Sequence, residues 1–154
     1  MTLDSRAFRQ ALGTFATGVT IVTTVDETGR DVGLTANSFN SVSLDPPLVL
    51  WSLAKSSMSL RAFSAAHHFA IHILAADQEA LSNQFAKPGA AKFDGVDVQR
   101  GEGGIPLLTG CAARFQCRTA YQYDGGDHVI FVGEVQHFDH AECAPLLFHG
   151  GRYA

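Results

Sequence analysis

The chain has 154 residues, of which 46% are hydrophobic and 17% charged, which is enough for one globular domain and too little for two ordinary ones. We therefore expect one domain over residues 1–154. Its net charge of -4, with no run of Lys or Arg, argues against nucleic acid or an anionic membrane surface as a partner. The apolar stretches are shorter than the roughly 20 residues of a bilayer span, so we expect no membrane segment.

The N-terminal residues and the cysteines predict that the protein is located in the cytoplasm. Residues 1–10 carry three charged side chains where a secretory signal would be apolar. The three cysteines lack Cys-x-x-Cys spacing, which argues against a disulfide framework and a zinc ribbon: Cys111, Cys117 and Cys143. With 11 Phe and few charges, the surface should be short of polar cover, which favours a homo-oligomer.

The first 53 residues predict one helix followed by strands. An amphipathic helix begins after Asp4 or Ser5 and is stopped by Gly18, with apolar residues at helical spacing: Phe8, Leu12, Phe15 and Ala16. Val19–Val25 and Asp31–Ser38 then form a hairpin around the turn Asp26-Glu-Thr-Gly29. Asp45-Pro46-Pro47 interrupts the sheet, and Leu48–Leu53 begins a new strand.

The middle of the chain mixes short helices with one strand. A helix over Leu60–Ala66 leads to a strand over Phe69–Leu74, and Asp77 caps a second helix that ends near Phe85. Lys87–Gly110 is rich in glycine without a clean period, so we expect a long loop with one strand. Loops of this length are often functional.

The last third predicts two long strands. They cover Cys111–Tyr123 and His128–Phe138, joined by Asp124-Gly-Gly-Asp127 as a tight turn. Pro145–Phe148 is a final short strand. About six strands, mostly connected by hairpins, indicate a mainly β fold: a closed or nearly closed antiparallel barrel with a few short helices.

Common nucleotide and hydrolase motifs are absent. The sequence contains no Gly-x-Gly-x-x-Gly after a strand, no phosphate-binding loop ending in Gly-Lys-Ser/Thr, and no Gly-x-Ser-x-Gly elbow. Any nucleotide must therefore be held in another way.

Two polar clusters are candidate ligand contacts. Thr35-Ala-Asn-Ser38 and the residues through Ser43 could hydrogen-bond the edge of a flat heteroaromatic ligand, although a polar turn explains this composition about equally well. Lys55-Ser-Ser-Met-Ser59 places hydroxyls and an ammonium before a helix, where a phosphate is stabilised.

The histidines do not predict a metal site. His68 and His72 would share one face of a strand, but no carboxylate or cysteine lies at a companion spacing, so surface or packing roles are favoured. His128 differs because it follows the predicted hairpin turn, where a side chain can project into a cleft. Cys117 lies on a predicted strand, and we expect a buried, unreactive thiol.

Six segments together resemble the short-chain flavin reductases that supply two-component monooxygenases. They are Phe15-Ala-Thr-Gly-Val-Thr-Ile-Val-Thr23, Thr35-Ala-Asn-Ser-Phe39, Ser41-Val-Ser-Leu-Asp-Pro-Pro47, Leu107–Cys117, Gly126-Asp-His128 and Gly151-Arg-Tyr153. The resemblance implies the FMN-binding split barrel, a six-stranded antiparallel Greek-key-like barrel that forms homodimers with flavin near the subunit interface. It also implies hydride transfer from NADH, with NADPH as an alternative, to FMN or FAD. Reduced flavin would then diffuse to a separate oxygenase.

The resemblance also assigns site residues. Contacts to the isoalloxazine edge and ribityl chain would come from Thr35, Ala36, Asn37, Ser38, Ser41, Val42 and Ser43. The ribityl and phosphate end would be held by Ser52, Lys55 and Ser57, with further contacts from Lys92 and Phe93. On the nicotinamide side the matching residues are His128, the candidate catalytic residue, and Tyr153.

Two alternatives stay open at this point. A non-enzymatic flavin- or haem-binding split-barrel protein, acting as a sensor or store, would keep the serine clusters without needing His128. A split-barrel oxidase acting on a bound substrate, like the pyridoxamine phosphate oxidases, would need a pocket of several arginines, and few arginines lie near the clusters.

Overall fold

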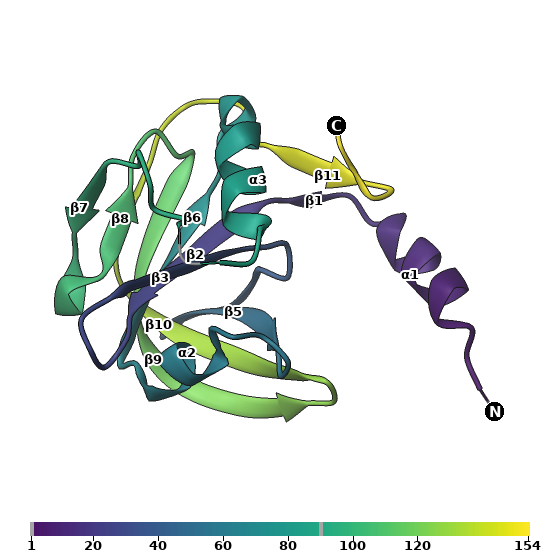
Figure 1. Ribbon diagram of the computed structural model, residues 1–154, viewed down its shortest axis with the longest axis horizontal. Coiled ribbons are helices and arrows are strands. Elements are labelled where there is room, and N and C mark those ends of the chain that lie inside the picture. Colours follow the sequence, from purple (N-terminus) through teal and green to yellow (C-terminus); the bar gives the residue numbers. More distant parts are fainter. Residues whose placement is uncertain (1, 90) are drawn as a thin grey trace.

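A strongly curved antiparallel sheet forms the framework of the computed structural model, which describes residues 2–89 and 91–154 (Figure 1). Met1 of the predicted N-terminal segment and Ala90 of the predicted loop lie outside the described residues. The strand order is β3-β2-β6-β9-β10-β5-β4, and every neighbouring pair is antiparallel. The strands are β2 (Thr20–Val25), β3 (Asp31–Ala36), β4 (Asn40–Leu44), β5 (Pro47–Ala54), β6 (His68–Ile73), β9 (Ala113–Gly125) and β10 (His128–His140). The predicted mainly β antiparallel barrel is confirmed, with seven strands in this sheet where six were expected.

The extra strand is β4, a segment for which the sequence left candidate ligand contacts and a polar turn both open and predicted no strand. It pairs with β5 at the edge of the sheet, from Asn40 opposite Leu50 to Leu44 opposite Pro47. One face of an edge strand can remain in water. A Ser- and Asn-rich segment can therefore be a strand here without the apolar alternation that marks a buried one.

Helix α1 (Ser5–Gly13) begins as predicted, because the Asp4 carboxylate accepts a hydrogen bond from the Arg6 amide at 3.0 Å. The predicted end at Gly18 is wrong. None of the residues of α1 is buried, and in Figure 1 the helix projects from the body of the protein. With no tertiary surface to extend along, the helix stops after Gly13, and Phe15 lies beyond it.

The other helices are short: α2 (Leu60–Ala65) and α3 (Glu79–Ala86), the latter preceded by the 3-10 turn η1 (Ala76–Gln78). The prediction that Asp77 caps the second helix is wrong, because the Gln78 side chain accepts from the Ala75 amide instead. No described helix is long and apolar enough to cross a membrane.

The predicted long loop contains a small hairpin of its own. Strands β7 (Val98–Arg100) and β8 (Pro106–Leu108) pair across η2 (Glu102–Gly104), so the loop has two strands where one was expected. At the C-terminal end, β11 (Leu147–His149) lies between β1 (Thr17–Gly18) and β12 (Arg152–Tyr153) in a third sheet. The predicted strand at Pro145–Phe148 is thus displaced by one to two residues.

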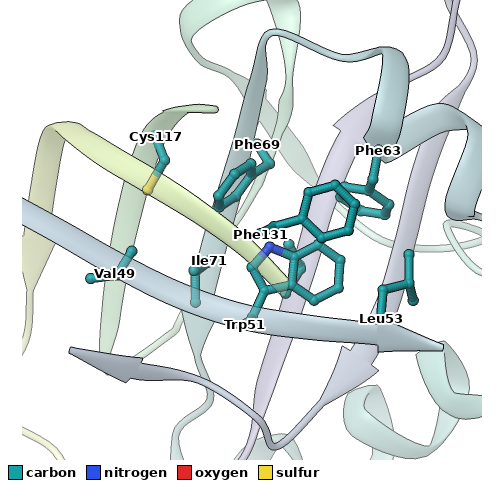
Figure 2. Packing of buried hydrophobic residues seen from close by; sticks show 9 residues of the cluster. Val49, Trp51, Leu53, Phe63, Phe69, Ile71, Cys117 and Phe131 are labelled. Carbon is teal, nitrogen blue, oxygen red and sulfur yellow. The ribbon is translucent and has the colours of Figure 1, made fainter. Parts of the chain in front are cut away.

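Aromatic packing fills the barrel (Figure 2). The Trp51 ring stacks on Phe131 with centroids 5.1 Å apart and meets the edge of Phe63 at 4.8 Å. All three side chains are essentially inaccessible to solvent. Such pairs add about 0.5–1.5 kcal/mol each beyond the burial of area, so this cluster should dominate the stability of the fold.

A buried histidine connects three strands on the side of the barrel away from this cluster. The His72 ring lies 2.9 Å from the Ile21 carbonyl through Nδ1 and accepts a hydrogen bond from the Leu108 amide at Nε2, at 3.0 Å. Both contacts are satisfied by neutral imidazole with the proton on Nδ1. Burial lowers the pKa of His72 to about 4, which keeps the ring neutral near pH 7. The expectation of a packing role is confirmed for this histidine.

The sheet does not close on itself. Its two edge strands are β3 and β4, and among the described residues no strand ladder joins β3 to β4 or to β5. The chain that leaves β3 is held to β5 by Ser38, whose hydroxyl donates to the Ser52 carbonyl at 3.2 Å and accepts from the Ser52 amide at 2.9 Å. We call the open side between β3 and β5, together with the chain that follows β5, the seam.

Candidate functional site

A cleft of about 980 Å3 opens along the seam. This volume lies at the upper end of the range for small-molecule sites. Its walls come from the β2–β3 turn, the outer side of β3, the segment between β5 and α2, the end of α3 and the loop that follows. The lining residues are Asp26–Thr28, Arg30–Thr35, Ser56–Ser59, Arg61, Ala62, Phe85, Ala86, Pro88, Gly89, Lys92 and Phe93.

The loop after α3 is fixed against β3 at Gly33. The Lys92 ammonium donates to the Gly33 carbonyl at 3.1 Å, and the Phe93 ring meets Phe85 edge-on at 4.9 Å. A Cβ on Gly33 would lie 2.9 Å from Phe85 and 3.1 Å from Phe93. Partial burial lowers the pKa of Lys92. The absence of a side chain at Gly33 therefore lets this loop form one wall of the cleft.

Two arginine side chains that line the cleft form no salt bridge with a carboxylate in the described part of the chain. Within residues 2–89 and 91–154, neither Arg30 nor Arg61 lies within 4 Å of an acidic oxygen. By contrast, Asp31 is engaged by Arg100, at 2.6 and 2.9 Å. Asp26 and Glu27 also line the cleft, so the charges of the lining balance, and Arg30 and Arg61 are the groups that could pair with an anionic group such as a phosphate.

Thr35 connects the cleft to the C-terminal end of the chain. Its hydroxyl donates to the Ser82 carbonyl in α3 at 2.6 Å. The Tyr153 hydroxyl donates to Asn83 at 2.8 Å and lies 2.7 Å from the Ser82 hydroxyl, which must then be the donor of that pair. Tyr153 thus supports the helix behind Thr35 and does not itself line the cleft.

The predicted phosphate cluster is divided by the fold. Ser57 lines the cleft, and its hydroxyl accepts from the Ser59 amide at 3.1 Å. The Lys55 ammonium instead pairs with Asp124 of the β9–β10 turn, outside the cleft lining. A phosphate in this cleft would therefore meet Arg30 or Arg61 more readily than Lys55.

The remaining residues predicted to contact flavin lie at the end of β3, in the chain that follows it and in β4 and β5, outside the cleft lining. The Ser38 hydroxyl is used by Ser52, as described above, and Ala36 accepts from Thr20 through its carbonyl at 2.7 Å. Asn37, Ser41 and Val42 are exposed, and Ser43 is half-buried. Of the predicted contacts, the cleft brings together Thr35, Ser57, Lys92 and Phe93.

His128 lies at the first position of β10, opposite Ala54. Its Nδ1 is 2.7 Å from the Asp127 carboxylate, and this hydrogen bond is the main cause of the lowered pKa of Asp127. The carboxylate favours the tautomer with the proton on Nδ1, which leaves Nε2 as an acceptor. The side chain is 45% exposed and is not part of the cleft lining.

The thiols and the other histidines form no second site of this kind. Within the described residues, no three or more His, Cys, Asp or Glu side chains converge as metal ligands. Cys117 is fully buried, and burial raises the pKa of its thiol to about 12. The prediction of an unreactive Cys117 agrees with this environment.

Sequence reasoning missed the two arginines and Met58. Arg30 follows a turn that was used only to place a hairpin, and Arg61 lies on the first turn of a helix thirty residues away. Only the approach of β3 to the segment after β5 brings them to one cleft.

The open antiparallel barrel with a cleft at its seam agrees with the split-barrel class of flavin reductases that the sequence resembles, and solved flavin reductases share this fold. The chain belongs within this class to the flavin reductase like domain family, whose pattern matches residues 12–154.

Individual relatives support the assignment. The chain is 54% identical over 150 residues to the FMN reductase (NADH) SmoA of Agrobacterium fabrum, covering 97% of this chain and 85% of that protein. It is 46% identical to the reductase component of the flavin-dependent trigonelline monooxygenase of Acinetobacter baylyi, covering 96% of this chain but 48% of that protein. The solved structure of the Streptomyces globisporus NADH:FAD oxidoreductase SgcE6, in complex with NAD and FAD fragments, superimposes with a TM-score of 0.93 at 40% identity, covering 98% of this chain and 92% of that one.

Proposed function

We propose that this protein transfers hydride from NADH to FMN or FAD and releases the reduced flavin to a separate flavin-dependent oxygenase. The observation that carries the proposal is the 980 Å3 cleft at the seam, in a chain of the flavin reductase like family. Its relatives include an NADH-dependent FMN reductase, an NADH:FAD oxidoreductase and a monooxygenase reductase component.

The residues of the cleft fit a flavin nucleotide. An isoalloxazine ring supplies the acceptor for hydride when it is bound. Thr35, Lys92 and the polar backbone of β3 would hydrogen-bond the ring edge, and the Phe93 ring would limit its exposure to water. Ser57, with Arg30 and Arg61, would hold the ribityl and phosphate end. The protein's part is then to orient the two reactants and exclude water, since the chemistry needs no protein nucleophile.

His128 is proposed to position the nicotinamide nucleotide. The Asp127 carboxylate holds the ring with Nε2 available, so His128 can accept a hydrogen bond or present an aromatic face to the nucleotide. We assign Tyr153 an indirect role through Ser82 and Thr35. We expect a preference for NADH, the nucleotide named for two relatives.

The active form is proposed to be a homodimer. Helix α1 buries none of its residues and exposes Phe8 and Leu12, and Phe15, just beyond its end, is exposed as well. The edge strand β4 likewise exposes Val42 and Leu44. A second copy covering these surfaces would bring Asn37 and Ser41–Ser43 into a site near the interface. The unpaired thiols also agree with a proposed location in the cytoplasm.

The test is NADH oxidation by the purified protein, followed by absorbance in air with FMN, FAD or no added flavin. Turnover that saturates with added flavin is expected, and the ratio of kcat/KM for the two flavins gives the preference. NADPH is compared in parallel. A protein that binds flavin but oxidises neither nucleotide would overturn the proposal in favour of a flavin-binding sensor or store.

The role of His128 is tested by His128→Ala. Loss of one hydrogen bond of about 1 kcal/mol should raise KM for NADH roughly fivefold, with the flavin Kd little changed. His140→Ala is the matched control, because His140 ends the same strand that His128 begins. An equal loss of flavin affinity in His128→Ala would make His128 part of the flavin site instead.

A further inference from the structure

Two cysteines outside the cleft are brought together where β9 begins and β10 ends. The Ala141 amide donates to the Ala112 carbonyl at 2.9 Å, which continues the β9–β10 pairing by one step. In an antiparallel pair, the residue before Ala112 and the residues after Ala141 lie in the same direction. Cys111 and Cys143 are those residues.

The chain after Ala141 turns back toward β9. The Cys143 amide donates to the Ala141 carbonyl at 3.1 Å. This tight turn ends the extended chain of β10, so Cys143 lies closer to Ala141 than it would in a strand. A second set of bonds fixes both cysteines to one short segment. Ala112 donates to the Ile73 carbonyl and Ala144 accepts from the Ala76 amide, each at 2.8 Å. Each cysteine thus directly precedes a residue bonded to the chain between Ile73 and Ala76.

We propose that Cys111 and Cys143 form a peroxide-sensitive thiol pair that closes to an intramolecular disulfide. The ladder and the turn bring both residues to the same corner of the sheet, and the Cys143 thiol is near enough to contribute to the raised pKa of Cys111. A disulfide requires this kind of proximity, with the two Cα atoms about 4.4–6.8 Å apart. Cys143 is exposed, Cys111 is partly exposed, and all three cysteines of the chain are unpaired.

The two cysteines take different parts in the reaction. Burial raises the pKa of the Cys111 thiol to about 11, and the neighbouring Cys143 contributes in the same direction. The exposed Cys143 therefore reacts first. Its sulfur attacks one oxygen of hydrogen peroxide, the O–O bond breaks, and water leaves a sulfenic acid. The Cys111 sulfur then attacks that sulfur, the S–O bond breaks, and its proton leaves with the hydroxyl as a second water.

The proposed function supplies the oxidant, because reduced flavin that is not captured reacts with oxygen to give hydrogen peroxide. The fraction of protein with the disulfide would therefore increase with the amount of reduced flavin that reacts with oxygen before an oxygenase binds it. The disulfide would also restrain the segment that leads to β11 and β12, which ends at Tyr153 behind the cleft.

The experiment adds hydrogen peroxide directly to the reduced protein, so it requires no turnover. After denaturation without reductant, the expected product is a chain that is not cross-linked to another chain and has lost two hydrogen atoms in mass, with a Cys111–Cys143 peptide recovered. Buried Cys117 is the internal control and should remain a thiol. Cys111→Ser should leave Cys143 oxidised to its acids or cross-linked between chains, and Cys143→Ser should leave Cys111 reduced.

The proposal fails if wild-type protein gives mainly disulfides between two chains, or if Cys143 is over-oxidised while Cys111 still reacts with iodoacetamide. A second arm replaces added peroxide by NADH and FMN in air, with and without catalase. A disulfide that forms with added peroxide but not in this arm supports the thiol pair and counts against the proposed flavin reduction.

Discussion

The wall of the barrel and its seam are built from similar strands but held in different ways. From β2 through β6, β9 and β10 to β5, every strand is paired on both sides or packed on the Trp51 cluster. At the seam, β3 has one paired side, and side chains take the place of a ladder: Ser38 on Ser52, and Lys92 on the Gly33 carbonyl. A sheet edge leaves backbone groups unpaired. At the seam, backbone groups of β3 therefore remain available to the ligand that we propose for the cleft.

The largest effect should come from breaking the wall. Phe131→Ala removes a fully buried ring that stacks on Trp51, and we expect a loss of about 3–5 kcal/mol in the free energy of unfolding. Urea denaturation followed by circular dichroism measures it. Phe138→Ala, in the same strand but 68% exposed, is the control and should cost far less. Similar losses for both would show that the cluster is not the source of stability.

Acid should weaken the wall through His72. The pKa is about 4 in the folded protein and 6.5 for an ordinary histidine, so the unfolded chain binds the extra proton between these values. Stability should fall as pH decreases from 6.5 towards 4, by up to about 1.4 kcal/mol per pH unit.

Removing the imidazole isolates this effect. His72→Gln should be less stable at pH 7, but its free energy of unfolding should depend less on pH between 6.5 and 4. Urea midpoints measured at intervals from pH 7 to pH 4.5 test this dependence. Arg114 and Asp139 also act on His72, in opposite directions, so their contributions are present in every comparison. His67→Gln, at an exposed site, is the control. An unchanged slope in His72→Gln would assign the acid sensitivity to other groups.

At the seam, Gly33→Ala should displace the loop that carries Lys92. The new Cβ would meet Phe85 and Phe93 inside ordinary contact distance, and overpacking of this kind costs about 1–3 kcal/mol. Flavin affinity should fall more than it does in variants of the wall with the same loss of stability. Gly18→Ala, where a Cβ meets nothing within 4 Å, is the control. Unchanged flavin binding in Gly33→Ala would separate the loop from the site.

The smallest effect is expected for Ser38→Ala, which removes the hydroxyl between β3 and β5. A loss of about 1 kcal/mol is expected for the hydrogen bonding, together with weaker flavin binding, because the seam can widen. Thermal unfolding and flavin titration are the measurements. Ser41→Ala, at an exposed position of β4, should change stability less, and a reversal of that order would contradict the role given to Ser38.

The sequence predicted the strands whose side chains alternate or whose residues are β-branched, and both main hairpins are present. It failed where no tertiary surface supports the local pattern. Phe15 continues the helical spacing of apolar residues but lies beyond the end of α1. Spacing alone does not show whether a helix packs against the rest of the protein, so it could not predict where α1 ends. Strand β4 was missed because its polar residues face water at a sheet edge.

The candidate site was predicted in part for a related reason. Thr35 and Ser57 lie in local polar clusters that are visible in the sequence. Arg30 and Arg61 belong to the cleft only because the barrel curls until β3 approaches the segment after β5. The local sequence does not predict that these two segments come together. Lys92 and Phe93 were predicted only from the resemblance to flavin reductases.

Trp51 is the only tryptophan in the chain, and it lies in the wall, not at the cleft. Its ring is inaccessible to solvent, and its indole N–H has no hydrogen-bond partner among the described residues. The intrinsic fluorescence of the protein should therefore be emitted at short wavelength from a dry site and shift to the red only when the barrel itself comes apart. Flavin fluorescence reports on the cleft, so in one sample the flavin emission follows the seam, and the tryptophan emission of the flavin-free protein follows the wall.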